Sequence, residues 1–159
     1  MATTVEKSII IGASPIKVWE RLTDFSRWKD WIEVDNPRPK DWGDSMKVYN
    51  GTGASTVLLM SMGDTPVQVW KVTEWEAGRK LTVALDSWLG HRTARMDVSI
   101  TVELSSSTNA ETAVAGRLEA CFSFPIMGAF LNAFVPMRAQ GEQTLSHFLN
   151  QLENAVRDA

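Results

Sequence analysis

The alternation of apolar and polar residues between residues 43 and 124 constrains this chain more than any other feature of its sequence. The pattern is clearest from Arg92 through Leu104, where every second residue from Met96 onward is apolar and those between are polar. Successive side chains of a strand point to opposite faces, so this segment predicts a strand with one apolar and one polar face. Strands of this kind form a sheet that is wet on one side, and something must cover the dry side.

Turn residues divide this region into six consecutive strands. The turns are predicted at 51–53, 63–66, 77–78, 89–91 and 105–110. The strands are predicted around Met46 and Val48 and at 56–62, 67–76, 79–88, 92–104 and 112–122. Short turns between consecutive strands are typical of an antiparallel meander. A seventh strand is predicted at 4–11, which is rich in β-branched residues.

Two short helices are predicted directly after the first strand. Ser14 is a favourable N-cap, and Pro15 suits the first helical position. The first helix is expected to bury the apolar residues that follow at helical spacing: Ile16, Trp19, Leu22 and Phe25. A second helix is expected from Ser26 through Trp31, and the proline-containing segment 36–39 predicts a loop.

The cover for the dry face is predicted to be the C-terminal segment, from Ile126 onward. At about 100° per residue its apolar residues fall on one stripe: Met127, Phe130, Phe134, Leu145, Phe148, Leu149, Leu152 and Val156. Pro136 predicts a kink or a break near residues 132–136. The chain is therefore predicted to be one α+β domain, residues 1–159. Its curved seven-stranded antiparallel sheet wraps around a long C-terminal helix, with two short helices after the first strand.

Composition excludes several classes of protein. With 44% apolar and 22% charged residues, the chain is typical of a globular domain. The net charge of −3 gives no basic excess, so no nucleic-acid partner is predicted. No apolar run approaches the roughly 20 residues that span a bilayer, and no secretory signal is apparent, so the predicted location is the cytoplasm. Cys121, the single cysteine, is interpreted as a small core residue rather than a nucleophile.

Common catalytic motifs are missing from the sequence. The two histidines, His91 and His147, are far apart, and neither has a second His or Cys at ligand spacing. A histidine-based metal site is therefore not expected. There is no G-x-S-x-G nucleophile motif and no phosphate-binding glycine fingerprint. No metal and no cofactor are predicted.

Two segments carry a resemblance to a known family. They are IIIGASPIKVWERLTDFSRWKDW at 9–31 and WKVTEWEAGRKLTV at 70–83. Together with the order of the elements, they resemble the helix-grip fold of the START-related superfamily called SRPBCC. Its members include polyketide cyclase/dehydrase-like proteins and the birch-pollen allergen family. The resemblance covers essentially the whole chain. The chain departs from the family pattern in the loop 35–44 and at Pro136. The resemblance therefore does not predict the shape of the cavity mouth.

The resemblance implies a cavity between the sheet and the C-terminal helix that binds an apolar small molecule, such as a lipid or a polyketide-like or aromatic metabolite. The predicted lining, for which ordinary core packing is the competing interpretation, comprises Met60, Trp70, Val83, Leu85, Val98, Ile100, Leu118, Phe122, Phe130 and Phe134. Seven tryptophans add to this expectation, because aromatic rings supply large rigid contact area.

Two charged residues, Glu74 and Arg138, are candidate polar contacts of the ligand. Arg138 falls within the apolar stripe of the last helix. Either its stem covers apolar surface while its head reaches water, or the cation meets a ligand carboxylate or phenolate. Gly141, next on that face, is interpreted as a site of close helix–sheet packing. Under strict alternation Glu74 shares a face with Trp70. That face is either inward, where Arg138 is a possible partner, or outward and solvated.

Three functions follow from these observations. The first is a non-catalytic carrier or sensor of an apolar ligand. The second is an enzyme of the aromatase/cyclase kind, in which Glu74 and Arg138 form the only candidate catalytic pair. The third is an interaction module that meets a protein partner through the tryptophan-rich residues 28–42. Both a monomer and a homodimer are compatible with the sequence.

Overall fold

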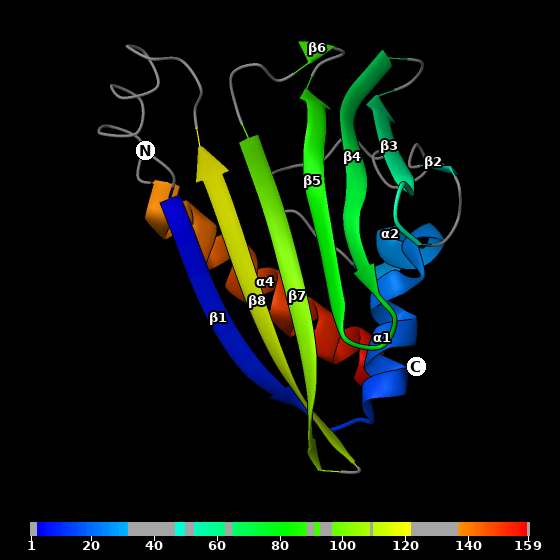
Figure 1. Cartoon of the computed structure of the whole chain (residues 1–159), viewed down its shortest axis with the longest axis vertical. Helices are drawn as coiled ribbons and strands as arrows, with labels where there is room; N and C mark the ends of the chain where they lie inside the picture. Colours follow the sequence, from blue (N-terminus) through cyan, green and yellow to red (C-terminus); the bar gives the residue numbers. More distant parts are fainter. Residues whose placement is uncertain are drawn as a thin grey trace.

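The structure is a computed structural model that describes residues 3–31, 47–49, 53–62, 65–88, 91–92, 97–108, 110–121 and 137–158. Figure 1 shows a curved antiparallel sheet with one long helix across its inner side and two short helices beside that helix. The predicted loop at 36–39, the predicted break near 132–136, and Phe122, Phe130 and Phe134 lie outside the described residues.

Seven strands run through the described part of the sheet in the order β1-β8-β7-β5-β4-β3-β2, and a short eighth strand, β6, pairs with β5. All neighbours are antiparallel. The strands are β1 (Thr3–Ile11), β2 (Lys47–Tyr49), β3 (Val57–Met62), β4 (Thr65–Glu76), β5 (Lys80–Trp88), β6 (His91–Arg92), β7 (Asp97–Thr108) and β8 (Glu111–Cys121). The predicted seven-stranded meander is confirmed, and the last strand returns to lie beside the first.

One predicted turn is too long. Residues 105–110 were expected to turn, but β7 continues through Thr108. Ser105 pairs with Ala113, and Ser106 pairs with Thr112, so the polar residues extend the ladder instead of ending it. Serine and threonine tolerate a solvent-exposed strand, which is why their polarity alone does not mark a turn here.

The helices are α1 (Pro15–Thr23), the 3₁₀ turn η1 (Phe25–Arg27), α2 (Trp28–Trp31) and α4 (Met137–Arg157). Ser14 occupies the N-cap position of α1, but its side chain makes no capping bond. The expected burial of Ile16 is wrong, because 69% of its surface is exposed, and Val18 is buried instead. At about 100° per residue Ile16 lies roughly 200° around the helix from Val18. None of the described helices combines the length and the apolar character that crossing a membrane requires.

Close packing of α4 on the sheet depends on two glycines. A Cβ atom at Gly141 of α4 would lie 3.1 Å from Cγ2 of Val5 on β1. A Cβ atom at Gly116 of β8 would lie 2.9 Å from Cδ1 of Leu145, which is fully buried. Both glycines therefore let the helix approach β1 and β8 more closely than any other residue would. The interpretation of Gly141 as a packing residue is confirmed.

Candidate ligand-binding site

The inner face of the sheet is apolar but unevenly covered. At one end of β7, Val102 and Leu104 are buried in the core. At the other end, Val98 and Ile100 point to the same side and pack against the core, yet they stay only half-buried. Among the described elements, α4 approaches β1, β8, α1 and α2 most closely. Val98 and Ile100 thus lie at the end of β7 that the described elements leave partly uncovered.

A hollow of about 230 Å³ opens at this end of the sheet. It lies where the pairing of β5 with β7 ends, at Ala84 and Ser99. Leu85, Val98 and Ala120 line it from the inner face, and Asp97, Ser99 and Glu119 line it from the outer face, so the hollow spans the gap where the strands diverge. Ligand pockets in proteins typically hold roughly 300–1,000 Å³. At about 230 Å³ this hollow is smaller than such a pocket.

The predicted lining residues divide into three groups. Val83, Leu85 and Leu118 are buried members of the inner face. Trp70, Val98 and Ile100 are half-buried against the same core. Met60 is on β3, but the position of its side chain is not described. The structure thus brings the described apolar candidates to one face of the sheet.

Glu74 does not belong to that face, so its inward alternative is wrong. The register of β4 against β5 shifts between Val72 and Glu74, which inserts Thr73 as an extra residue. Such a bulge moves the following side chain to the opposite face. Val72 is buried, Thr73 and Glu74 are both exposed, and Trp75 points inward again. Strict alternation, on which the sequence interpretation depended, fails at this one step.

Hydrogen bonds and an ion pair hold the Glu74 carboxylate on the outer face. Its Oε2 accepts a bond of 2.7 Å from the Thr82 hydroxyl and lies 3.1 Å from Nζ of Lys80. The hydroxyl bond, followed by the interactions with Lys80, lowers the pKa of Glu74 below its ordinary value. Bonding to Glu74 in turn raises the pKa of Lys80. Thr82 also lies 3.0 Å from the Thr101 hydroxyl. Because the single Thr82 proton goes to Glu74, Thr101 is the donor in that bond.

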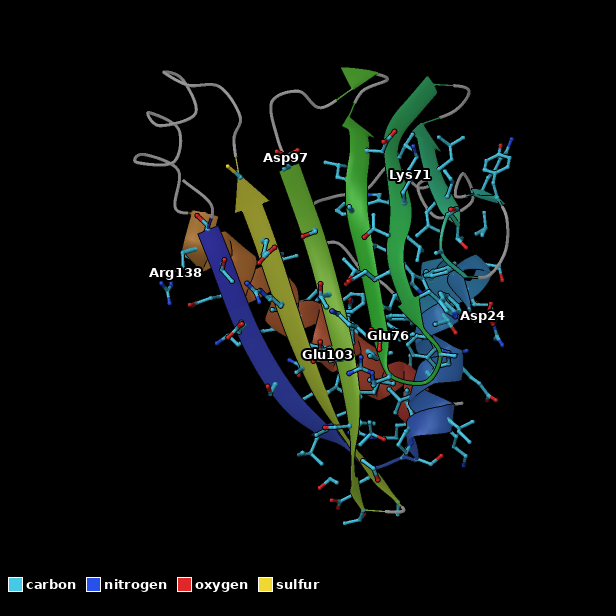
Figure 2. All side chains as sticks on the ribbon, viewed as in Figure 1. Asp24, Lys71, Glu76, Asp97, Glu103 and Arg138 are labelled. Atoms are coloured by element: carbon cyan, nitrogen blue, oxygen red, sulfur yellow. The ribbon has the colours of Figure 1, made fainter. Side chains whose placement is uncertain are left out.

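Arg138 is also far from the inner face. Figure 2 shows its side chain pointing away from the sheet at the start of α4. The side chain is 79% exposed, and its Nε lies 3.5 Å from Oε1 of Glu142. One turn later Gly141 lies over β1, and β8, β7 and β5 separate β1 from β4. Arg138 and Glu74 therefore cannot form the predicted pair. The Arg138 head reaches water, but at 79% exposure its stem does not cover apolar surface as the first alternative expected.

A second hollow, of about 340 Å³, lies on the outer face over β1, β8, β7 and β5. Its charges are largely paired with one another. Arg117 lies 2.5 Å from Glu119 and 3.9 Å from Glu6, and Lys80 lies 3.7 Å from Glu103. Because these charged side chains are already paired in an exposed groove, the outer hollow offers few favourable contacts to an apolar ligand.

The described residues hold no group of three His, Cys, Asp or Glu side chains that could bind a metal ion. His91 lies in β6 rather than in the predicted turn. His147, in α4, is half-buried. Cys121 is half-buried at the end of β8 and lines the smaller hollow.

An aromatic cluster joins α2 to α4, and the sequence did not single it out. The rings of Trp28 and Trp31 are 5.9 Å apart, and each contacts Phe148 of α4, at 6.1 and 5.6 Å respectively. Phe25 continues the cluster toward Trp75 of β4. The helical spacing that placed Phe148 on the apolar stripe was the available signal. The interaction-module hypothesis had instead assigned Trp28 and Trp31 to an exposed surface, and both are buried.

A family described as "Polyketide cyclase / dehydrase and lipid transport" matches residues 2–157 of the chain. The chain belongs to this family. The superfamily resemblance inferred from the sequence is thereby confirmed. No curated protein matches the chain.

Solved structures place this member of the polyketide cyclase/dehydrase family in a known fold. A norcoclaurine synthase from Thalictrum flavum, in complex with dopamine and hydroxybenzaldehyde, matches with a TM-score of 0.69 at 11% identity, over 99% of this chain and 88% of that one. A START superfamily protein from Mycobacterium smegmatis matches at 0.64 and 15%, over 98% and 97%. Ara h 8.0201 matches at 0.63 and 11%, over 100% of both chains. At these identities the likeness shows the helix-grip fold alone.

Proposed function

We propose that this protein binds an apolar small molecule between the inner face of its sheet and α4. The observation that carries the proposal is that Val98 and Ile100 are only half-buried, whereas the other end of the same face is buried in the core. When a ligand covers apolar side chains that were partly exposed, each Å² of apolar surface removed from water stabilises the complex by about 25 cal/mol. The family supplies a hydrophobic-ligand-binding scaffold, which agrees with that geometry.

Binding without catalysis fits the described residues better than the aromatase/cyclase alternative. Cyclisation needs an acid or a base positioned at the ligand. The proposed catalytic pair is absent, because Glu74 lies on the outer face and Arg138 points to solvent. The ligand class we propose is a lipid or an aromatic, polyketide-like metabolite, and the proposed location is the cytoplasm.

Substitutions that fill the proposed binding space with a larger side chain test the proposal. Titrations of palmitic acid and of 9-fluorenone, followed by native mass spectrometry and calorimetry, first establish which ligand the wild-type protein binds. Ile100→Trp should weaken that binding more than tenfold, because the larger ring occupies the uncovered space. Val98→Phe provides a second variant if Ile100→Trp does not fold.

Ser105→Trp is the matched control, because Ser105 is exposed on the outer side of the same strand. It should bind like the wild-type protein. Equal binding by the Ile100 and Ser105 variants, or a wild-type protein that binds no member of the panel, would contradict the proposal.

A further inference from the structure

The side chain of Trp31, the last residue of α2, contains a buried donor for which the described part of the chain supplies no acceptor. Only 8% of the residue surface is exposed. Its indole nitrogen, Nε1, is inaccessible to solvent and has no hydrogen-bond partner among the described residues. Buried polar groups in folded proteins are almost always hydrogen-bonded, so an exception of this kind requires an explanation.

The neighbouring tryptophan differs from Trp31 in this respect. Trp28 lies in the same short helix and is buried to the same degree. Its indole N–H donates to the Leu22 carbonyl at 2.8 Å. One member of a contacting pair of rings is therefore satisfied by the fold itself, whereas the other keeps its donor unused.

The surroundings of Trp31 define the kind of acceptor that suits it. Its ring contacts those of Trp28 and Phe148. Phe148 comes from α4, packs against the core and is only half-buried, so this aromatic cluster is partly uncovered at its α4 side. Burying a charged group beside aromatic rings is costly, whereas a neutral carbonyl needs a single donor. Flat apolar ligands also pack well against such rings.

We propose that the Trp31 indole N–H is the polar anchor of the ligand site and donates to a neutral carbonyl on a ring-bearing apolar ligand. This inference rests on the proposed function, because it identifies one contact within the same site. It assigns a substrate class, aromatic ketones and related neutral carbonyl compounds, in preference to pure hydrocarbons. Phe148 provides the adjoining apolar wall.

A matched pair of probes tests the anchor. 9-Fluorenone and fluorene have nearly the same shape and differ in a carbonyl in place of a methylene. Calorimetric titration of the wild-type protein should show tighter binding of the ketone. Trp31→Phe keeps an aromatic ring and removes the N–H, so it should weaken fluorenone binding about three- to tenfold and leave fluorene binding unchanged. Trp19→Phe, which removes an indole that contacts Trp75 instead, should bind both probes like the wild-type protein.

The outcomes separate this inference from the proposed function. Equal affinity of the wild-type protein for both probes, or equal loss of both in Trp31→Phe, would overturn the anchor while leaving apolar binding intact. Failure of the wild-type protein to bind either probe or palmitic acid would overturn the proposed function as well. If Trp31→Phe does not fold, the indole ¹H–¹⁵N signal of Trp31 in the wild-type protein shows whether this N–H donates to the ligand. It should move downfield with fluorenone and not with fluorene, and an identical response to both probes would reject the anchor.

Discussion

The indole N–H of Trp28 donates a hydrogen bond of 2.8 Å to the backbone carbonyl of Leu22. Leu22 lies in the last turn of α1, where carbonyl groups have no partner within the helix. A tryptophan six residues further along the chain therefore caps α1 and fixes the position of α2 beside it. Trp31, whose ring lies against that of Trp28, has no equivalent acceptor in the described structure.

This difference predicts unequal effects of the same substitution. Trp28→Phe breaks a buried bond and leaves the Leu22 carbonyl without that partner. Trp31→Phe removes a donor that has no partner among the described residues. Both lose similar ring volume, so we expect Trp28→Phe to lower the free energy of unfolding by about 1–3 kcal/mol more than Trp31→Phe. Urea denaturation of the two ligand-free variants measures the difference, and equal losses would contradict the assignment.

Substitution of Gly116 should loosen the contact of α4 with the sheet. The Cβ atom of Gly116→Ala would approach Leu145 to 2.9 Å, and the surrounding core leaves Leu145 little freedom to move. Overpacking of this kind costs about 1–3 kcal/mol. Gly12→Ala is the control, because nothing lies within 4 Å of the added atom. Thermal unfolding should separate the two variants, and a Gly116→Ala protein as stable as Gly12→Ala would show that the helix is not tightly held.

The pKa of Glu74 should depend on Thr82. The Thr82 hydroxyl bond is the largest cause of its lowered pKa. Thr82→Val should therefore raise the Glu74 pKa toward its ordinary value of 4.5. NMR titration of the side-chain carboxyl carbons provides the measurement. An unchanged Glu74 pKa in Thr82→Val would mean that the bond does not persist in solution.

The same groups give the stability a defined pH dependence. Because the folded-state pKa of Glu74 is depressed, its contribution is complete above the unfolded pKa and is lost as the pH falls through the lower folded value. The folded-state pKa of Lys80 is raised, so its contribution is complete below 10.5 and is lost as the pH rises above that value. Thr82→Val should therefore reduce the acid-side loss, measured as unfolding midpoints between neutral pH and pH 3.

Removing the charge of Glu74 or of Arg138, the candidate catalytic pair, should leave ligand binding unchanged. Glu74→Gln alters the outer face, and Arg138→Ala removes an exposed ion pair with Glu142. Such surface pairs contribute little to stability. Calorimetric titrations should give the wild-type affinity for both variants. A tenfold loss of ligand affinity in either variant would show that the substituted residue contributes to binding.

Regular periodicity made most of the fold predictable. The alternation in β7 and the helical stripe of α4 are long enough to identify the sheet, its apolar face and the helix that covers it. The shared inner face of Val98 and Ile100 followed from that alternation. Gly141 was informative for a related reason, since a glycine inside a helix is costly unless close packing requires it.

Local irregularities limited the prediction of the site. The bulge before Glu74 changes the face of the side chains that follow it in β4, and no residue type in that segment marks it. The buried donor of Trp31 is equally hidden in the sequence, because its difference from Trp28 depends on where the Leu22 carbonyl lies in space. Both features arise from the tertiary arrangement rather than from local pattern.

Methyl-resolved NMR during a titration tests the central claim most directly. The wild-type protein, labelled at its Val, Leu and Ile methyl groups, is titrated with 9-fluorenone and with palmitic acid. If a ligand binds between the sheet and α4, the methyl signals of Val98, Ile100 and Leu118 shift. The signal of Ile10, which is exposed, stays in place. Shifts confined to Ile10 and other exposed methyl groups, or no shifts with either ligand, would contradict a binding site on the inner face.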